Sequence, residues 1–340
     1  MAADQDSERS RRLLFAPELE TGTVRMADLA RAEVRAAAQS KRVPSALSRR
    51  YQGSLMRRGA LRYETETVEQ MMRARRTVLG DAASGPPRLV VRVDAFPHPL
   101  AADEPGRYGT ERFRSVHDVL ASAGVNYLTP VAPRVSRRPL DPRGQDWRPL
   151  DDGELEQLAE LRRDGVAFGA GGLDHRTRRG AARRRSELAG LRNEALAERL
   201  DLAAEELAAA AIRPDVLVPP WGRFGWRQWP ELAKRYSVIG GRRESVGTFG
   251  YHDGPLWRGE AVWMPAYSPL HGTAAEVLAA VRRLEELGAA LWVPVVLDWG
   301  RETDAGLEDL AELSGRMAPL STDWEVFLEA VRFSRGSIEP

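Results

Sequence analysis

Short apolar runs alternate with longer amphipathic segments through most of the chain after residue 87. The two strongest runs are RLVVRVD at 88–94 and AALWVPVVL at 289–297. Runs of this length, rich in β-branched residues and bounded by glycine and proline, predict buried strands. Weaker runs predict further strands over 125–129, 165–168, 215–218 and 236–239.

Helical periodicity fills most of the segments between these runs. Helices are predicted over 152–163, 186–211, 274–287, 306–317 and 322–332. In the first of these, Leu155, Leu158 and Leu161 recur at helical spacing on one side. Alternating strands and helices predict an α/β fold with a parallel sheet, either open or closed into a barrel.

The first 86 residues have a different pattern. We expect a disordered tail over 1–12 and a helical extension over 13–86, with helices at 26–38 and 64–79. The segment 41–62 is rich in arginine, which predicts a solvated helix face or a contact with an anionic molecule or a protein partner. A glycine- and proline-rich linker at 80–87 then leads into the barrel domain, 87–335.

Composition narrows the function classes. The chain has 340 residues, a formal net charge of +1 and no cysteine. A near-neutral charge argues against a nucleic-acid partner, and the lack of cysteine excludes disulfides and thiolate metal sites. No apolar run reaches the about 20 residues of a membrane span, and no apolar signal region follows the N-terminus. We therefore expect a cytoplasmic protein without a membrane span.

Polar residues follow several of the predicted strands directly. They are Asp94, the loop 171–175, Trp221 with Arg223, and Asp298. The carboxyl ends of parallel strands open on one face of a barrel, so these residues are expected to converge on one cleft. Arg92 lies two residues before Asp94, and the two side chains share one face of the strand. They form either a structural ion pair or a joint contact to a substrate.

Five short motifs in this order resemble the polysaccharide deacetylase family, of the carbohydrate esterase type. They are RVDAFP, GGLDHR, PPWGRF, MPAYSPLHG and VVLDWGRE, and the resemblance covers 88–335. It implies a distorted (β/α) barrel that acts on a carbohydrate and a role in glycan biosynthesis. It also implies a divalent metal, usually zinc, held by an aspartate and two histidines next to a second aspartate that serves as general base.

The resemblance carries over incompletely. Asp94 matches the general base and His175 matches the second metal histidine. Ala95 stands at the metal aspartate and Gly171 at the first metal histidine, and neither has a ligating atom. Asp298 replaces a late histidine that acts as the acid. The resemblance thus implies Asp94, His175 and Asp298 as catalytic residues of a degraded metal site.

A catalytic zinc needs about three protein ligands and a water molecule. A rebuilt site would combine His175 with Asp94, Asp298, His98 or His271. The alternative is that no cofactor binds and that His175 is a relic hydrogen-bonded to an aspartate.

The substrate side of the cleft is expected to contain aromatic and arginine residues. Trp221 and Arg223 match the family's substrate loop, and Tyr267 follows in MPAYSPLHG. Together with Arg92 they are the predicted substrate-binding residues. Core packing is the competing interpretation for each tryptophan between 221 and 263. His117, on a predicted helix at 115–123, and His252, in a predicted turn, are expected to have no functional role.

Three functions remain open from the sequence. The first is hydrolysis of the C–N bond of an N-acylated sugar at an altered or rebuilt metal site. The second is a catalytically inactive module that binds a glycan or a partner enzyme, in which the basic N-terminal helices are a candidate contact. The third is metal-free acid–base chemistry on a sugar by Asp94, His175 and Asp298.

Overall fold

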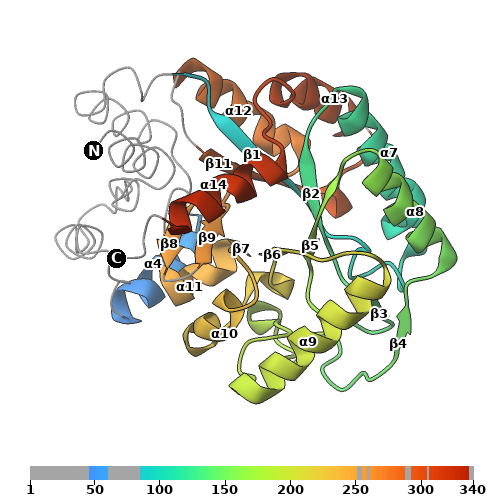
Figure 1. Ribbon diagram of the computed structural model, residues 1–340, viewed down its shortest axis with the longest axis vertical. Coiled ribbons are helices and arrows are strands. Elements are labelled where there is room, and N and C mark those ends of the chain that lie inside the picture. Colours follow the sequence, from blue (N-terminus) through green and yellow to red (C-terminus); the bar gives the residue numbers. More distant parts are fainter. Residues whose placement is uncertain are drawn as a thin grey trace.

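The computed structural model describes residues 46–59, 85–250, 255–258, 261–287, 292–304 and 306–336. The expected tail at 1–12, the helices at 26–38 and 64–79, and the turn at His252 lie outside the described residues. Within the basic segment, helix α4 (Ala46–Arg57) packs against helix α11 (Val246–Phe249). Part of the N-terminal extension therefore lies against the barrel (Figure 1).

A nine-stranded sheet forms the centre of the described structure, in the order β10-β11-β1-β2-β5-β6-β7-β9-β8. The strands are β1 (Arg88–Asp94), β2 (Tyr127–Val131), β5 (Ala167–Ala170), β6 (Val216–Leu217), β7 (Val238–Gly241), β8 (Leu256–Arg258), β9 (Ala261–Pro265), β10 (His271–Gly272) and β11 (Trp292–Asp298). All neighbours pair in parallel except β8 with β9. The sheet curls without closing, because β10 and β8 end it.

Helices surround this sheet (Figure 1). They are α6 (Pro105–Tyr108), α7 (Thr110–Ser122), α8 (Asp152–Arg163), α9 (Asn193–Ala209), α10 (Trp229–Ala233), α12 (Ala274–Leu287), α13 (Gly306–Met317) and α14 (Trp324–Gly336). A short antiparallel pair, β3 (Arg134–Ser136) with β4 (Trp147–Pro149), lies apart from the sheet. The predicted distorted (β/α) barrel is confirmed. None of the described helices is both long and apolar enough to cross a membrane.

The side chains of strand β1 alternate between two hydrophobic cores on opposite faces of the sheet. Leu89, Val91 and Val93 belong to the large core between the sheet and the helices. Val90 belongs to the smaller core inside the barrel, which helix α14 fills from one end with Trp324 and neighbouring residues. Since side chains alternate along a strand, the positions two and four residues after Val90 face the same interior. The two buried polar side chains of β1, at 92 and 94, thus belong to the barrel interior.

Several sequence-based expectations need correction. The helix predicted over 186–211 begins only at Asn193, because Ser186 and Glu187 are fully buried in the loop before it. The short strands β8, β9 and β10 were not predicted. Runs this short have too little period-two pattern to be recognised.

His117 lies on α7, within the helix predicted at 115–123, and its side chain has a structural role. It is 4% exposed on α7, and its ring nitrogens lie 2.9 Å from the Tyr127 hydroxyl and 2.9 Å from Asp164 Oδ2. The side chain therefore links α7 to β2 and to the end of α8. A buried polar ring with both nitrogens partnered stabilises the fold rather than a reaction.

We expect Leu89→Ala to lower the free energy of unfolding by about 3 kcal/mol, because the lost side chain leaves a cavity in the main core. Leu89 is fully buried. Leu155→Ala is a matched control, since Leu155 is 42% exposed on α8, and its effect should stay below about 0.5 kcal/mol. Urea unfolding monitored by tryptophan fluorescence measures both. Equal shifts of the two variants would contradict this placement of the core.

Candidate functional site

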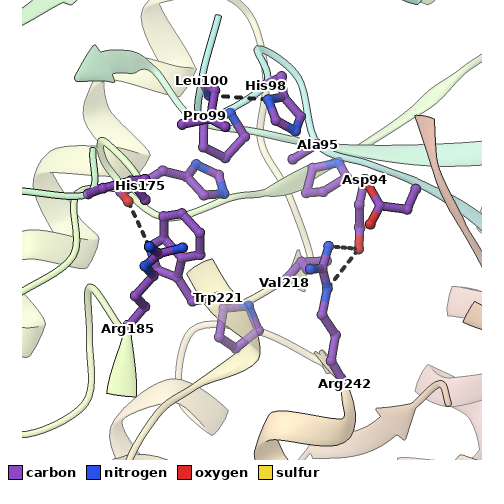
Figure 2. A pocket seen from close by; sticks show the side chains of 14 residues that line it. Asp94, Ala95, His98, Pro99, Leu100, His175, Arg185, Val218, Trp221 and Arg242 are labelled. Carbon is purple, nitrogen blue, oxygen red and sulfur yellow. Dashed lines mark hydrogen bonds and ion pairs between the residues drawn. The ribbon is translucent and has the colours of Figure 1, made fainter. Parts of the chain in front are cut away.

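A cavity of about 200 Å³ opens where the carboxyl ends of the strands meet. Asp94 ends β1 and Asp298 ends β11, and the two residues are direct partners in the strand register. The cavity is lined by Asp94, Ala95, His98, Pro99, Leu100, Pro130, Leu140, His175, Arg185, Val218, Pro219, Trp221, Arg242 and Asp298 (Figure 2). The predicted convergence of Asp94, His175, Trp221 and Asp298 on one cleft is therefore observed.

Asp94 is bound by two guanidinium groups. Arg92 Nε lies 2.6 Å from Asp94 Oδ1, and Arg92 Nη2 donates to Oδ2 at 3.0 Å. Arg242, just after β7, donates to Oδ2 from Nε at 3.1 Å and also from Nη2. Asp94 is 2% exposed and Arg92 is 1% exposed. Both carboxylate oxygens are thus engaged from within the protein, and Figure 2 shows the contact of Arg242 with one of them.

These ion pairs decide the charge of Asp94. Burial alone would raise the pKa of Asp94, but the charges of Arg92 and Arg242 outweigh it and hold this pKa well below its usual value. For Arg242, burial lowers the pKa while the charges of Asp94 and Asp298 raise it further, so the pKa of Arg242 lies above its usual value. Asp94 is an anion at neutral pH and a weak base, because accepting a proton would break two ion pairs.

Asp298 has the opposite environment. Burial raises the pKa of Asp298 and the Arg242 charge offsets this only in part, while the Asp94 charge raises it again. No hydrogen bond joins its carboxyl group to another described residue. The two neighbouring carboxyl groups therefore differ in their affinity for a proton, which is the pattern of an acid–base pair rather than of two equivalent carboxylates.

His175 lies across the cavity from the Asp94–Arg242 pair (Figure 2). It is 7% exposed and has a positive φ of 52°. Burial, together with the Arg242 charge, lowers the pKa of His175 to about 4. The imidazole is thus neutral at pH 7, with one nitrogen able to accept a hydrogen bond.

The loop that carries His175 is held by a buried ion-pair network. Arg199, on α9, donates to Glu187 Oε1 at 2.7 Å and to Asp174 Oδ1 at 2.5 Å. Glu187 also accepts from the Leu173 backbone N–H at 2.9 Å. Glu187 and Asp174 are almost fully buried, so Arg199 compensates two carboxylates that have little contact with water.

His98 was predicted as a possible metal ligand, but its ring already makes a hydrogen bond and a stacking contact. The Leu100 backbone N–H donates to Nδ1 at 3.1 Å, and the ring stacks on Tyr108 with centroids 3.9 Å apart. Burial, with the nearby His175, lowers the pKa of His98 to about 3. In a neutral ring whose Nδ1 accepts, Nε2 carries the proton. His98 therefore has no free lone pair for a metal in this arrangement.

The described residues do not fit the three-ligand zinc site that the sequence resemblance implies. No group of three or more histidine, aspartate or glutamate side chains within the described ranges is placed to hold a metal ion. A side chain at Gly171 would put its Cβ 3.1 Å from the Val131 carbonyl carbon and 3.2 Å from His175 Cε1. The position that the resemblance assigns to the first metal histidine is therefore crowded by neighbouring atoms. Both carboxylate oxygens of Asp94 are already paired with arginines, Arg92 and Arg242.

Only one of the four predicted substrate-binding residues lines the cavity. Trp221 lines the cavity, and its Nε1 donates to the His175 carbonyl at 2.8 Å. Arg92 is buried beneath Asp94, and Tyr267 is 2% exposed in a cluster with Met56 and Val246. Arg223, Arg92 and Tyr267 are not lining residues of the cavity. Their substrate-binding roles stay predictions that these positions do not favour.

Two arginines of the cavity were not predicted. Arg242 follows the predicted strand at 236–239 after two glycines, at the same distance at which Trp221 follows the predicted strand at 215–218, so the same search for polar residues would have found it. Gly240 is needed there, because a Cβ would lie 2.6 Å from Arg92 Nη1. Arg185 lies in an arginine-rich loop without periodic pattern, and no sequence signal distinguishes it from its neighbours.

Comparisons with known proteins are limited to fold. No family model and no curated protein matches the chain. Solved structures that resemble it include a family 4 carbohydrate esterase from Streptomyces lividans in complex with acetate, with 9% identity and a TM-score of 0.42 over 71% of this chain and 92% of that chain. A second structure, from Parabacteroides distasonis, is provisionally described as a glycoside hydrolase/deacetylase. It has 10% sequence identity to this chain and a TM-score of 0.47, and the match covers 74% of this chain and 72% of that chain.

A third structure, 4-alpha-glucanotransferase from Thermococcus litoralis, gives 10% identity and a TM-score of 0.49 over 72% of this chain and 40% of that chain. At these identities and scores, the likeness assigns no activity, substrate or ligand to this chain.

We expect Arg199→Met to lower the free energy of unfolding by about 3 kcal/mol, because it leaves Glu187 and Asp174 as unpaired buried charges. Arg282→Met is the matched control. Arg282 pairs with Glu312 at the surface, where both side chains are nearly half-exposed, and the cost should be below about 1 kcal/mol. Denaturant unfolding of both variants checks this, and similar losses would show that the network is not structural.

The pKa of His175 predicts a pH dependence of stability. Its folded-state pKa of about 4 lies below the usual histidine pKa of about 6.5, so the unfolded chain binds the proton more tightly. The stability associated with a neutral His175 is fully present above pH 6.5 and is lost as the pH falls toward about 4.

His175→Asn should therefore lose less stability than the wild type between about pH 7 and about pH 5. The raised pKa of Asp298 contributes with the opposite sign, since its stability contribution is lost as the pH rises, but it is present in both proteins. Unfolding midpoints at the two pH values measure the difference. Parallel pH profiles would refute the buried neutral imidazole.

Proposed function

We propose that this chain acts on a carbohydrate in the cavity between β1, β5, β7 and β11, by general acid–base chemistry that needs no bound metal. The observation that carries the proposal is the contrast between two adjacent carboxyl groups. Asp94 is paired with Arg92 and Arg242, whereas its register partner Asp298 has no hydrogen bond to a described residue, and their pKa values shift in opposite directions. Such a pair combines a carboxylate that is held as an anion with a neighbouring carboxyl group that binds a proton more readily.

Each residue then has a distinct role. Asp298 donates a proton to a sugar oxygen or nitrogen and recovers it later in the cycle. His175 is neutral and accepts a hydrogen bond or proton from the substrate. Asp94 does not exchange protons but anchors Arg242, whose guanidinium supplies a fixed positive charge in the cavity. This charge stabilises negative charge that develops on the substrate.

Sugar binding is supported by Trp221 and by the motif resemblance. Trp221 is half-buried in the cavity lining, and its indole is oriented by the hydrogen bond to the His175 carbonyl. An aromatic face held beside polar groups suits a sugar ring, which has an apolar face and polar edges. The motifs from RVDAFP to VVLDWGRE resemble a family that acts on carbohydrates.

A second candidate is a glycan-binding module without turnover. It is favoured by Asp94, the residue that matches the family's general base, because both of its oxygens are engaged by arginines. The two candidates share the cavity and differ only in whether Asp298 exchanges a proton with the bound sugar.

We expect Asp298→Asn to reduce turnover by at least about a hundredfold while sugar binding persists, because amides do not donate protons at neutral pH. Proton NMR of N-acetylated and reducing sugars in deuterated buffer detects both acetate release and hydrogen exchange. Asp118→Asn is the control, since Asp118 is exposed on α7 and outside the cavity lining. Binding without any turnover in the wild type would favour the binding module.

Metal independence has its own test. After incubation with zinc and exhaustive dialysis, we expect substoichiometric zinc, and chelator treatment should leave turnover unchanged. One tightly bound zinc ion per chain that is lost in His175→Ala would contradict the metal-free proposal. It would restore hydrolysis at a rebuilt metal site as the leading function.

A further inference from the structure

Two arginines and two aspartates line the cavity: Arg185, Arg242, Asp94 and Asp298. Arg242 binds Asp94 together with Arg92, which lies outside the lining, and Arg185 lies on the side of Trp221 (Figure 2). Asp94 is therefore neutralised without Arg185. The lining carries a net positive charge when Asp298 holds a proton.

Arg185 has no acidic partner among the described residues. Its guanidinium carbon lies 5.5 Å from the centroid of the Trp221 ring, and its Nε is buried without a hydrogen-bond partner. A buried guanidinium nitrogen without a partner is costly unless a ligand or water supplies one. Arg185 is therefore positioned to donate a hydrogen bond from Nε to a ligand that is anionic or a strong acceptor.

Arg242 also keeps a free donor. Its Nε and Nη2 donate to Asp94, which fixes the plane of the guanidinium, and its Nη1 donates to no described residue. A guanidinium oriented in this way by one carboxylate can still bind a second acceptor through its remaining N–H groups. The arginine that neutralises Asp94 thus also contributes to the cationic lining.

Building on the proposed action on a carbohydrate, we propose that the cavity selects a sugar that carries a carboxylate or phosphate group, which Arg185 and Arg242 bind. Neutral sugars lack the anion that would satisfy Arg185 Nε. Carboxylates and phosphates both accept paired hydrogen bonds from guanidinium groups. Asp94 does not repel such an anion, because its charge is already balanced within the protein.

Isothermal titration calorimetry on the full chain tests this inference with glucuronic acid, glucose 1-phosphate and glucose. We expect at least one acidic sugar to bind about tenfold more tightly than glucose, because charge-assisted hydrogen bonds are the stronger ones. The tighter of the two acidic sugars identifies the anion as carboxylate or phosphate. Acetate and inorganic phosphate should bind more weakly than the corresponding sugar, since they lack the ring that contacts Trp221.

Arg185→Gln should bring the acidic sugars close to the affinity of glucose. Arg184→Gln is the matched control, because it makes the same charge change at an exposed residue of the same loop that does not line the cavity. Arg184→Gln should keep the preference. Unfolding midpoints of the two variants verify that both fold like the wild type, which is expected since Arg185 makes no ion pair with described residues.

The outcomes separate the two proposals. If glucose binds as tightly as both acidic sugars, or if Arg184→Gln weakens the preference as much as Arg185→Gln, the selection of an anionic sugar is refuted and action on a carbohydrate stands. If free acetate or phosphate binds as tightly as the corresponding sugar, the site binds anions without a sugar requirement. If none of the three sugars binds, the proposed action on a carbohydrate is refuted together with the inference.

Discussion

The ion-paired Asp94 is the interaction on which the cavity depends. A carboxylate almost removed from water is costly unless its charge is compensated nearby. Arg92 supplies one compensation from the same strand and Arg242 a second from the end of β7. The neighbouring strands adapt to this arrangement. Gly240 leaves space for the Arg92 guanidinium, and the inward face of β1 changes from Val90 to charged residues toward its carboxyl end.

The same interaction explains why the metal chemistry implied by the sequence motifs finds no support in the geometry. A divalent ion beside Asp94 would need the oxygen that Arg242 occupies, and a side chain at Gly171 would be crowded by Val131 and His175. Arg242 brings a positive charge to the cavity without requiring ligands of its own. Burial is the main cause of the lowered pKa values of His98 and His175, and the Arg242 charge lowers them further and partly counters the rise at Asp298.

The cavity is also organised from outside its lining. Arg199 on α9 binds Glu187 and Asp174, and these residues hold the loop from which His175 enters the cavity. Trp221 then hydrogen-bonds to the His175 carbonyl, which ties the aromatic wall to the backbone that carries the imidazole. Because Glu187 is buried as a partner of Arg199, it lies in the loop before α9 and not in the helix that was predicted from residue 186.

The amino-acid sequence by itself determined the α/β class, the strong strands β1 and β11, and the set Asp94, His175, Trp221 and Asp298 at the strand ends. Those features are local, because a β-branched run and the residue that ends it are contiguous in the chain. Only the tertiary structure decided which residue partners each of them. Arg242 reaches Asp94 from 148 positions away, and Arg185 enters from a loop without periodicity. The pKa of a carboxyl group depends on such distant charges and on burial, and neither can be read from the residues beside it.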